Sequence, residues 1–194
     1  MKELDVRYAN HPDDSKKYTT EELRKHYLIE EVFVKDDISL TYSHQDRIIA
    51  GGAYPVDKEL ILEAGDALRA DYFLQRRELG IINIGGDGIV TLDGKQYVMH
   101  KTDGLYVGMG TKEVKFSSID SNNPAKFYMC SSPAHKTCPT VYLPIEKAKK
   151  VPMGDQEHLN MRVINQFIHS DVLETCQLSM GMTVLCPGNA WNTM

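Results

Sequence analysis

From Val32 onward the chain is a series of short apolar or alternating runs separated by Gly, Asp and Asn. These runs span residues 38–42, 47–54, 80–84, 89–92, 96–99, 105–107, 114–117 and 126–130. Many short strands at regular spacing, with turn residues between them, are typical of a sandwich or a barrel. The pattern therefore predicts an all-β fold.

Two turn signals fit this interpretation. Asp93-Gly94 lies between two strand-like runs, and a type I′ hairpin turn favours such a pair because both central residues need a positive φ. The stretch Gly85-Gly86-Asp87-Gly88 is rich in glycine, but a strand-like run follows it instead of a helix. We therefore interpret it as a turn or bulge and not as a phosphate-binding loop.

One amphipathic helix is predicted before the strands. Thr19 and Glu22 have the spacing of a capping box, and Leu23 and Tyr27 lie four residues apart on one helix face.

The residue composition and the hydrophobic pattern change near residue 155, which divides the chain into two parts. Residues 131–155 are rich in proline, with one helical stretch predicted over 145–150, and are typical of a surface connector. Residues 162–168 and 172–185 return to strand texture. We therefore predict a first barrel with its connector over 1–155 and the opening strands of a second β-unit over 156–194.

Composition excludes several classes of partner. The chain has 194 residues and a formal charge of -5, and its few clustered lysines form no basic footprint for nucleic acid or an anionic membrane. No apolar run approaches the roughly 20 residues of a membrane span, and the N-terminus has no signal-peptide pattern. These features predict a cytoplasmic protein whose partners are small molecules or copies of itself.

The four cysteines lack the Cys-x-x-Cys spacing of a typical metal or redox site. In a reducing compartment we expect them to be thiols. Cys130, His135 and Cys138 could form part of a zinc cluster, but a fourth ligand is missing and the flanking prolines indicate an ordinary loop.

Two stretches resemble the motifs of the cupin jelly roll, in which His-x-His, a Glu and a later His converge on a metal. They are residues 72–85 and 103–113. The His-x-His positions hold Tyr72 and Leu74, the later His position holds Glu113, and Glu78 is the one ligand-type residue present. The resemblance implies that the first barrel is a metal-free cupin.

Longer blocks resemble one enzyme family, the 5-dehydro-4-deoxy-D-glucuronate isomerases, also called 4-deoxy-L-threo-5-hexosulose-uronate ketol-isomerases. The blocks are residues 42–52, 72–86, 124–128, 133–135, 173–181 and 187–194. The resemblance implies a bicupin fold with short helices and an aldose-ketose isomerisation of a small uronate-derived sugar acid in pectin breakdown. It also implies a homo-oligomer, hexameric in the family.

In that family zinc binds in the second barrel, through a His-x-His and Glu motif that follows the block matching residues 191–194. The resemblance thus implies that all zinc ligands lie beyond Met194, that the second barrel is truncated here, and that this chain alone is inactive. It places neither a metal ligand nor the catalytic base, which stays unknown, within residues 1–194.

Three residues are predicted to bind substrate. Arg162 lies in a block resembling the family and could pair bidentately with the substrate carboxylate, or it could be a solvated strand-end arginine. Gln177 alternates with Leu178 along a predicted strand, so either the polar or the apolar set faces the interior. Trp191 could wall the cavity or anchor the core.

Other polar clusters have two interpretations each. Arg76-Arg77-Glu78 could be functional, or an ion pair or subunit contact. His44 and Asp46 could be an acid/base pair, or His44 could be structural. Two other functions remain open for the whole chain: a non-catalytic sugar-binding or structural cupin module, and a related deoxyglucuronate isomerase of inositol breakdown.

Overall fold

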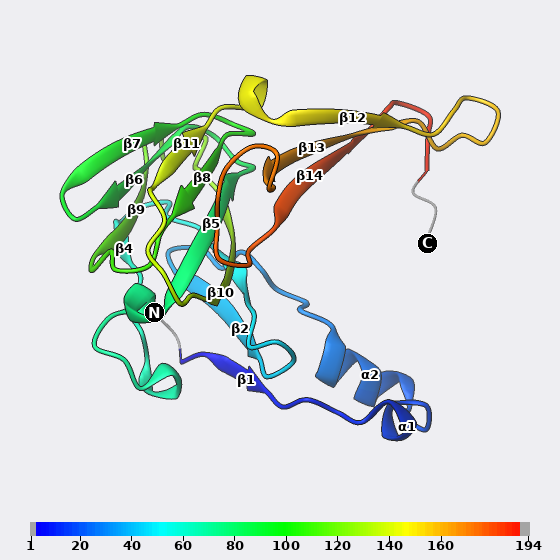
Figure 1. Ribbon diagram of the computed structural model, residues 1–194, viewed down its shortest axis with the longest axis horizontal. Helices are drawn as coiled ribbons and strands as arrows, with labels where there is room; N and C mark the ends of the chain where they lie inside the picture. Colours follow the sequence, from blue (N-terminus) through cyan, green and yellow to red (C-terminus); the bar gives the residue numbers. More distant parts are fainter. Residues whose placement is uncertain (1–2, 191–194) are drawn as a thin grey trace.

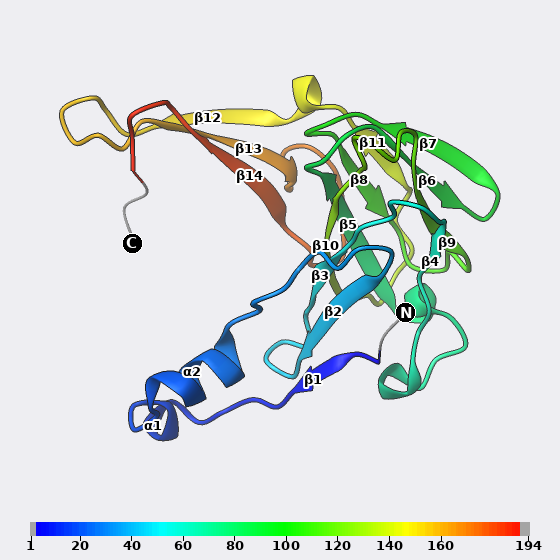
Figure 2. The same ribbon diagram turned by 180° about the vertical axis from the view of Figure 1, so that it is seen from behind.

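The computed structural model describes residues 3–190 and shows a β-barrel with a smaller sheet projecting from it (Figures 1 and 2). The barrel consists of a seven-stranded and a four-stranded sheet, and the projecting sheet has three strands. The predicted all-β class with short helices is confirmed. None of the helices within residues 3–190 has the length and apolar character needed to cross a membrane.

The two barrel sheets pack face to face around one core. The larger has the order β1 (Asp5–Arg7), β2 (Ile38–Ser43), β3 (Ile49–Ala53), β10 (Phe127–Pro133), β5 (Arg77–Asn83), β8 (Gly104–Val107), β11 (Val141–Leu143). The smaller has the order β4 (Leu60–Ile61), β9 (Val114–Ser118), β6 (Gly88–Leu92), β7 (Lys95–Met99). Leu79 and Ile81 of the larger sheet and Val90 and Phe116 of the smaller belong to one buried cluster.

Short helices flank the two sheets of the barrel. They are α1 (Pro12–Ser15), α2 (Thr20–Tyr27) and the 3-10 turns η1 (Asp66–Leu68), η2 (Phe73–Gln75) and η3 (Ile145–Lys147). Of these, η2 places Phe73 and Leu74 in the barrel core. The capping box at the start of α2 is confirmed: the Glu22 N–H donates to Thr19 Oγ1, and the Thr19 N–H donates to Glu22 Oε2 at 2.7 Å.

The predicted turns are also confirmed. Asp93 and Gly94 have φ values of 46° and 85° and join β6 to β7. A second turn with two positive φ values joins β2 to β3 at Asp46 and Arg47, both at 52°. Local sequence patterns do not predict this turn because neither residue is glycine. Gly85 and Gly86 form a bend before β6, which begins at Gly88, and Asn83 holds this bend because its amide donates to the Gly86 and Met99 carbonyls.

The predicted connector contains regular structure. The order of the projecting sheet is β12 (Lys149–Met153), β13 (Arg162–Ile168), β14 (Met180–Leu185), so β12 comes from the connector region. Pro152 is compatible with β12 because this strand lies at a sheet edge. The helix predicted over 145–150 is shortened to η3, and the strand predicted over 172–185 begins only at Met180.

A second buried cluster joins the projecting sheet to the outer face of the barrel. Ile82 and Tyr106 from the barrel pack with Phe167, Ile168 and Met180 from β13 and β14. Two glycines allow this close approach. A Cβ on Gly80 would lie 2.5 Å from Ile168 Cδ1, and a Cβ on Gly104 would lie 2.8 Å from Phe167 Cδ1.

Candidate functional site

A buried carboxylate lies where the barrel meets the projecting sheet. Glu78 is 0% exposed, and its side chain accepts hydrogen bonds from the backbone N–H groups of three consecutive residues, 176–178, at 2.7–2.9 Å. The hydroxyls of Tyr106 and Ser132 donate to it at 2.6 and 3.1 Å. Consecutive N–H groups directed at one anion form a concave nest. The loop before β14 is therefore fixed to the barrel by one carboxylate.

These contacts decide the charge of Glu78. Burial by itself raises the pKa of Glu78, but the hydrogen bonds from Tyr106 and from the three backbone N–H groups outweigh burial, and the pKa lies below its ordinary value. Burial, together with the hydrogen bond to Glu78, raises the pKa of Tyr106 far above its ordinary range. The pair is therefore a carboxylate and a neutral phenol at physiological pH.

The direction of Glu78 differs from that of a cupin metal ligand. On β5, Leu79 and Ile81 face the barrel core, whereas Glu78 and Gly80 face the projecting sheet. Because side chains alternate along a strand, Arg77 and not Glu78 has the inward position. Within residues 3–190 no group of three or more His, Cys, Asp or Glu side chains could hold a metal ion. The described residues therefore do not provide a zinc site. All four cysteines are free thiols.

Arg77 lies in the mouth of the barrel and is 5% exposed. Its Nε donates to Ser131 Oγ at 3.0 Å, and its Nη2 donates to the carbonyls of Ser131 at 2.8 Å and Arg47 at 2.7 Å. The Tyr42 ring packs 5.6 Å from its guanidinium carbon. Arg77 and Glu78 thus point to opposite faces of β5 and do not form an ion pair with each other. The interpretation of this cluster as an internal ion pair is wrong.

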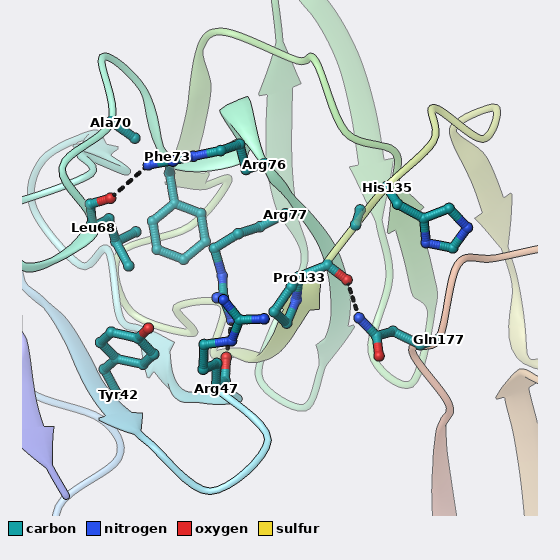
Figure 3. Close-up of a pocket in the computed structure, with 11 residues that line it drawn as sticks. Tyr42, Arg47, Leu68, Ala70, Phe73, Arg76, Arg77, Pro133, His135 and Gln177 are labelled. Carbon is teal, nitrogen blue, oxygen red and sulfur yellow. Dashed lines mark hydrogen bonds between the residues drawn. The ribbon is translucent and has the colours of Figure 1, made fainter.

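A cavity of about 450 Å³ opens beside Arg77 (Figure 3). It is lined by Tyr42, Arg47, Leu68, Ala70, Phe73, Arg76, Arg77, Pro133, Ala134, His135 and Gln177. Figure 3 shows Tyr42, Phe73 and Arg77 on one side and His135 and Gln177 on the other. We call this cavity the arginine pocket. Three arginines and one histidine line it, with no Asp or Glu among its described lining residues.

The three predicted substrate-binding residues are not brought together. Arg162 begins β13 and lies opposite Met153 and Leu185. In Figure 1, β13 starts at the end of the projecting sheet away from the barrel. Its Nη1 donates to the Asn160 carbonyl at 2.9 Å. Gln177 lies beside the barrel, and its amide donates to the Pro133 carbonyl. Trp191 lies outside the described residues.

Buried and exposed side chains alternate around Gln177 as predicted, but these residues do not form the predicted strand. Leu178 and Met180 are buried, whereas Gln177 and Ser179 are exposed, so the apolar set faces the core. Residues 176–178 form a loop because their backbone N–H groups bind the Glu78 carboxylate instead of a neighbouring strand. Gln177 still reaches the arginine pocket.

His44 and Asp46 lie beyond the end of β2 and not on it. The His44 ring packs between the rings of Tyr8 and Tyr42, with centroid distances of 4.8 and 4.9 Å. Among the described contacts, none joins His44 to Asp46 as an acid/base pair would require. The structural interpretation of His44 agrees better with these contacts.

The sequence did not single out Arg47 or Arg77 individually as a ligand-binding residue, and Arg77 was considered only as part of the Arg76-Arg77-Glu78 cluster. The available signal was the two-residue period of β5, which places Arg77 on the same face as Leu79 and Ile81. Arg47 gave no such signal, because its position depends on an unexpected turn and on a contact thirty residues away along the chain.

The barrel of two facing sheets, with a further sheet attached to its outer face, defines an all-β protein of the cupin class. The chain belongs to the KduI/IolB family, whose model matches residues 27–194.

Relatives in this family are close in sequence. Proteins called 4-deoxy-L-threo-5-hexosulose-uronate ketol-isomerase from Lachnoclostridium phytofermentans and Halalkalibacterium halodurans are 53% and 49% identical over 98% of this chain. One from Lacticaseibacillus paracasei is 52% identical over 97% of it. The chain spans 67–69% of the length of these three relatives.

Among solved structures, an IolB-like protein from Salmonella typhimurium LT2 superposes with a TM-score of 0.52 and 12% sequence identity. The match covers 66% of this chain and 47% of that one. At this identity the likeness concerns the fold alone.

Proposed function

We propose that this protein is a ketol-isomerase of uronate breakdown, converting 5-dehydro-4-deoxy-D-glucuronate into 3-deoxy-D-glycero-2,5-hexodiulosonate. The observation that carries the proposal is the identity of 49–53% over 97–98% of the chain to relatives with this activity in their names. An unrelated binding module of the same fold would not retain such identity along its whole length.

The reaction moves a carbonyl by one carbon. A base removes the proton from the carbon next to the aldehyde, an enediolate forms, and a proton is returned to the former aldehyde carbon. No atom is gained or lost overall, and no external oxidant is needed. The base stays unassigned among the described residues.

Substrate binding is proposed for Arg162, Gln177 and Trp191. Arg162 is half-buried at the start of β13, where the hydrogen bond from Nη1 to the Asn160 carbonyl fixes one side of its guanidinium. A fixed guanidinium suits the planar carboxylate of a sugar acid. Gln177 is an adaptable hydrogen-bonding group for hydroxyls.

Zinc is proposed as the cofactor on the family resemblance, with ligands expected beyond Met194. Residues 3–190 contain no cluster of three or more suitable ligands. A homo-oligomer, hexameric as in the family, a place in pectin breakdown and a cytoplasmic location are proposed on the same resemblance.

The related isomerase of inositol breakdown is the alternative activity. The family is described by two names, KduI and IolB. The relatives at about 50% identity are called uronate ketol-isomerases. A non-catalytic cupin module is the alternative without chemistry.

The test is an isomerase assay on the full-length protein, with the product followed by NMR. Conversion of the open-chain uronate aldehyde to the 2,5-diketo acid is the expected result. Turnover of only the inositol-derived deoxyglucuronate, or of neither substrate by zinc-loaded protein, would refute the proposal. Arg162→Met should raise KM for the uronate by about tenfold or more, because a charge-assisted hydrogen bond is lost. Arg24→Met on exposed α2 is the matched control.

A further inference from the structure

The arginine pocket has an excess of positive charge that the described chain does not neutralise. No Asp or Glu within residues 3–190 forms an ion pair with Arg47, Arg76 or Arg77, although seven ion pairs of Lys or Arg occur elsewhere in that part of the chain. Of the three, Arg77 is buried, and buried charges in proteins are otherwise paired or bound to a ligand. An anion is the partner that would neutralise it.

Arg77 is directed at this missing partner. Its Nε and Nη2 are saturated by neutral oxygens of Ser131 and Arg47, whereas Nη1 has no acceptor among the described residues. The pKa of Arg77 is lowered to about 10, mainly by burial; the nearby charge of Arg47 contributes in the same direction, whereas Tyr42 opposes it. The Nη1 nitrogen of this fixed, buried guanidinium is therefore available to a ligand in the cavity.

Two further arginines, Arg47 and Arg76, lie at the rim of the pocket that Arg77 also lines. Arg77 donates to the carbonyl of Arg47, which holds the positive-φ turn that carries the exposed Arg47 side chain. Arg76 donates to the carbonyls of Leu68 and Arg69 at 3.0 and 2.9 Å and so orders the opposite wall. His135 and Gln177 complete the polar side, and Phe73 and Leu68 supply an apolar wall.

We propose that the arginine pocket binds the carboxylate of a small sugar acid, with Arg77 Nη1 and the Arg47 guanidinium as its anchors. A guanidinium matches the plane of a carboxylate, while the polar rim and apolar wall suit the hydroxyls and carbon face of a sugar. The volume of about 450 Å³ falls in the range of small-molecule pockets, roughly 300–1,000 Å³.

This site is distinct from the substrate contact proposed at Arg162, although Gln177, which is also proposed to bind the isomerase substrate, lines the pocket as well. Arg162 lies at the far end of β13 from Ile168, the residue that packs against Gly80 on the barrel. The arginine pocket lies in the mouth of the barrel, beside Tyr42 and Ser131. A sugar acid bound there therefore occupies a second site, and its binding does not require isomerase activity.

The experiment is calorimetric titration of the full-length protein at low ionic strength with D-glucuronate. D-glucose is the neutral ligand of equal size, and inorganic phosphate tests another anion. We expect glucuronate to bind with an affinity that falls as salt is added, and glucose not to bind. In parallel, the NMR signal of the Arg77 Nε–H should shift on addition of glucuronate, because the buried hydrogen bond to Ser131 protects this proton from exchange.

Arg47→Met is the main variant, because Arg47 is exposed and its loss leaves the core intact. It should weaken glucuronate binding by about tenfold or more, the effect of one charge-assisted hydrogen bond. Arg77→Met should weaken it at least as much. Arg24→Met removes an equal charge on distant α2, and Arg162→Met removes the proposed substrate contact; neither should change binding at the pocket.

Wild-type affinity in Arg47→Met would overturn the proposal, as would loss of binding in Arg162→Met alone, which would place the sugar acid at the proposed isomerase contact. Phosphate binding at least as tightly as glucuronate would overturn the assignment to a carboxylate. Because these are binding measurements, a failed isomerase assay does not affect their outcome.

Discussion

The Tyr106 hydroxyl donates a 2.6 Å hydrogen bond to the Glu78 carboxylate on the face of the barrel that meets the projecting sheet. Both residues are completely buried. Their strands, β5 and β8, are neighbours in the barrel, whereas the N–H groups that share the same carboxylate belong to the loop at 176–178. One ionised group therefore joins two parts of the chain about a hundred residues apart.

Glu78→Gln should lower the free energy of unfolding by about 2–3 kcal/mol. The neutral amide offers only one acceptor oxygen to five donors, and its own N–H groups face donors. Urea unfolding followed by circular dichroism measures the change. Glu174→Gln, in the same loop but exposed and, within residues 3–190, paired with Lys136 alone, is the control and should cost less than about 1 kcal/mol. Equal effects of the two substitutions would contradict the structural role of Glu78.

Tyr106→Phe should cost about 1–2 kcal/mol, because it removes one donor to the carboxylate and keeps the packing of the ring. The costs of Tyr106→Phe and Glu78→Gln should not add, since each removes the same hydrogen bond. A double-mutant cycle should give a coupling free energy of about 1 kcal/mol or more, whereas Tyr106→Phe combined with Glu174→Gln should be additive. A coupling near zero would mean that the hydroxyl and the carboxylate act independently.

The stabilisation by Glu78 should depend on pH in one direction. The pKa of Glu78 is lowered in the folded protein from the ordinary value of 4.5, so its contribution is complete above that value and is lost as pH falls through the lowered one. The difference in unfolding free energy between wild type and Glu78→Gln should therefore be largest at about pH 7 and should shrink below about pH 4. A difference that grows on acidification would show that the carboxyl is protonated in the fold.

Local sequence patterns predicted the barrel because its strands and turns are specified locally. The alternation around β5 and β6, the Asp93-Gly94 pair and the Thr19 to Glu22 box each depend on residues a few positions apart. The same reasoning failed over 172–179, where Leu178 and Met180 alternate with polar residues as in a strand. There the long-range contact with Glu78 takes the N–H groups that a strand would use.

Local sequence patterns also fail to predict most of the arginine pocket, because the pocket depends on contacts between residues far apart in the chain. The direction of Arg77 follows from the period of β5, but its lack of a counter-ion depends on which residues the fold brings near it. Arg47 reaches the pocket through a turn with two positive φ values at residues that rarely adopt them. Arg162 and Gln177 were chosen individually, and no short-range pattern reports that they lie at different ends of the projecting sheet.

Gly80→Ala tests the contact between the barrel and the projecting sheet without changing any charge. The added Cβ would lie 2.5 Å from Ile168 Cδ1 and 2.7 Å from the Met180 sulfur, both at the ends of flexible side chains, so these side chains must shift. We expect a loss of about 1–2 kcal/mol in unfolding free energy. Ile168→Val removes the Cδ1 atom and should make room, so that the alanine costs clearly less in the Ile168→Val background than in the wild type. If the two substitutions are additive in urea unfolding, Ile168 does not pack on Gly80 and the arrangement of the two sheets must differ from the one described.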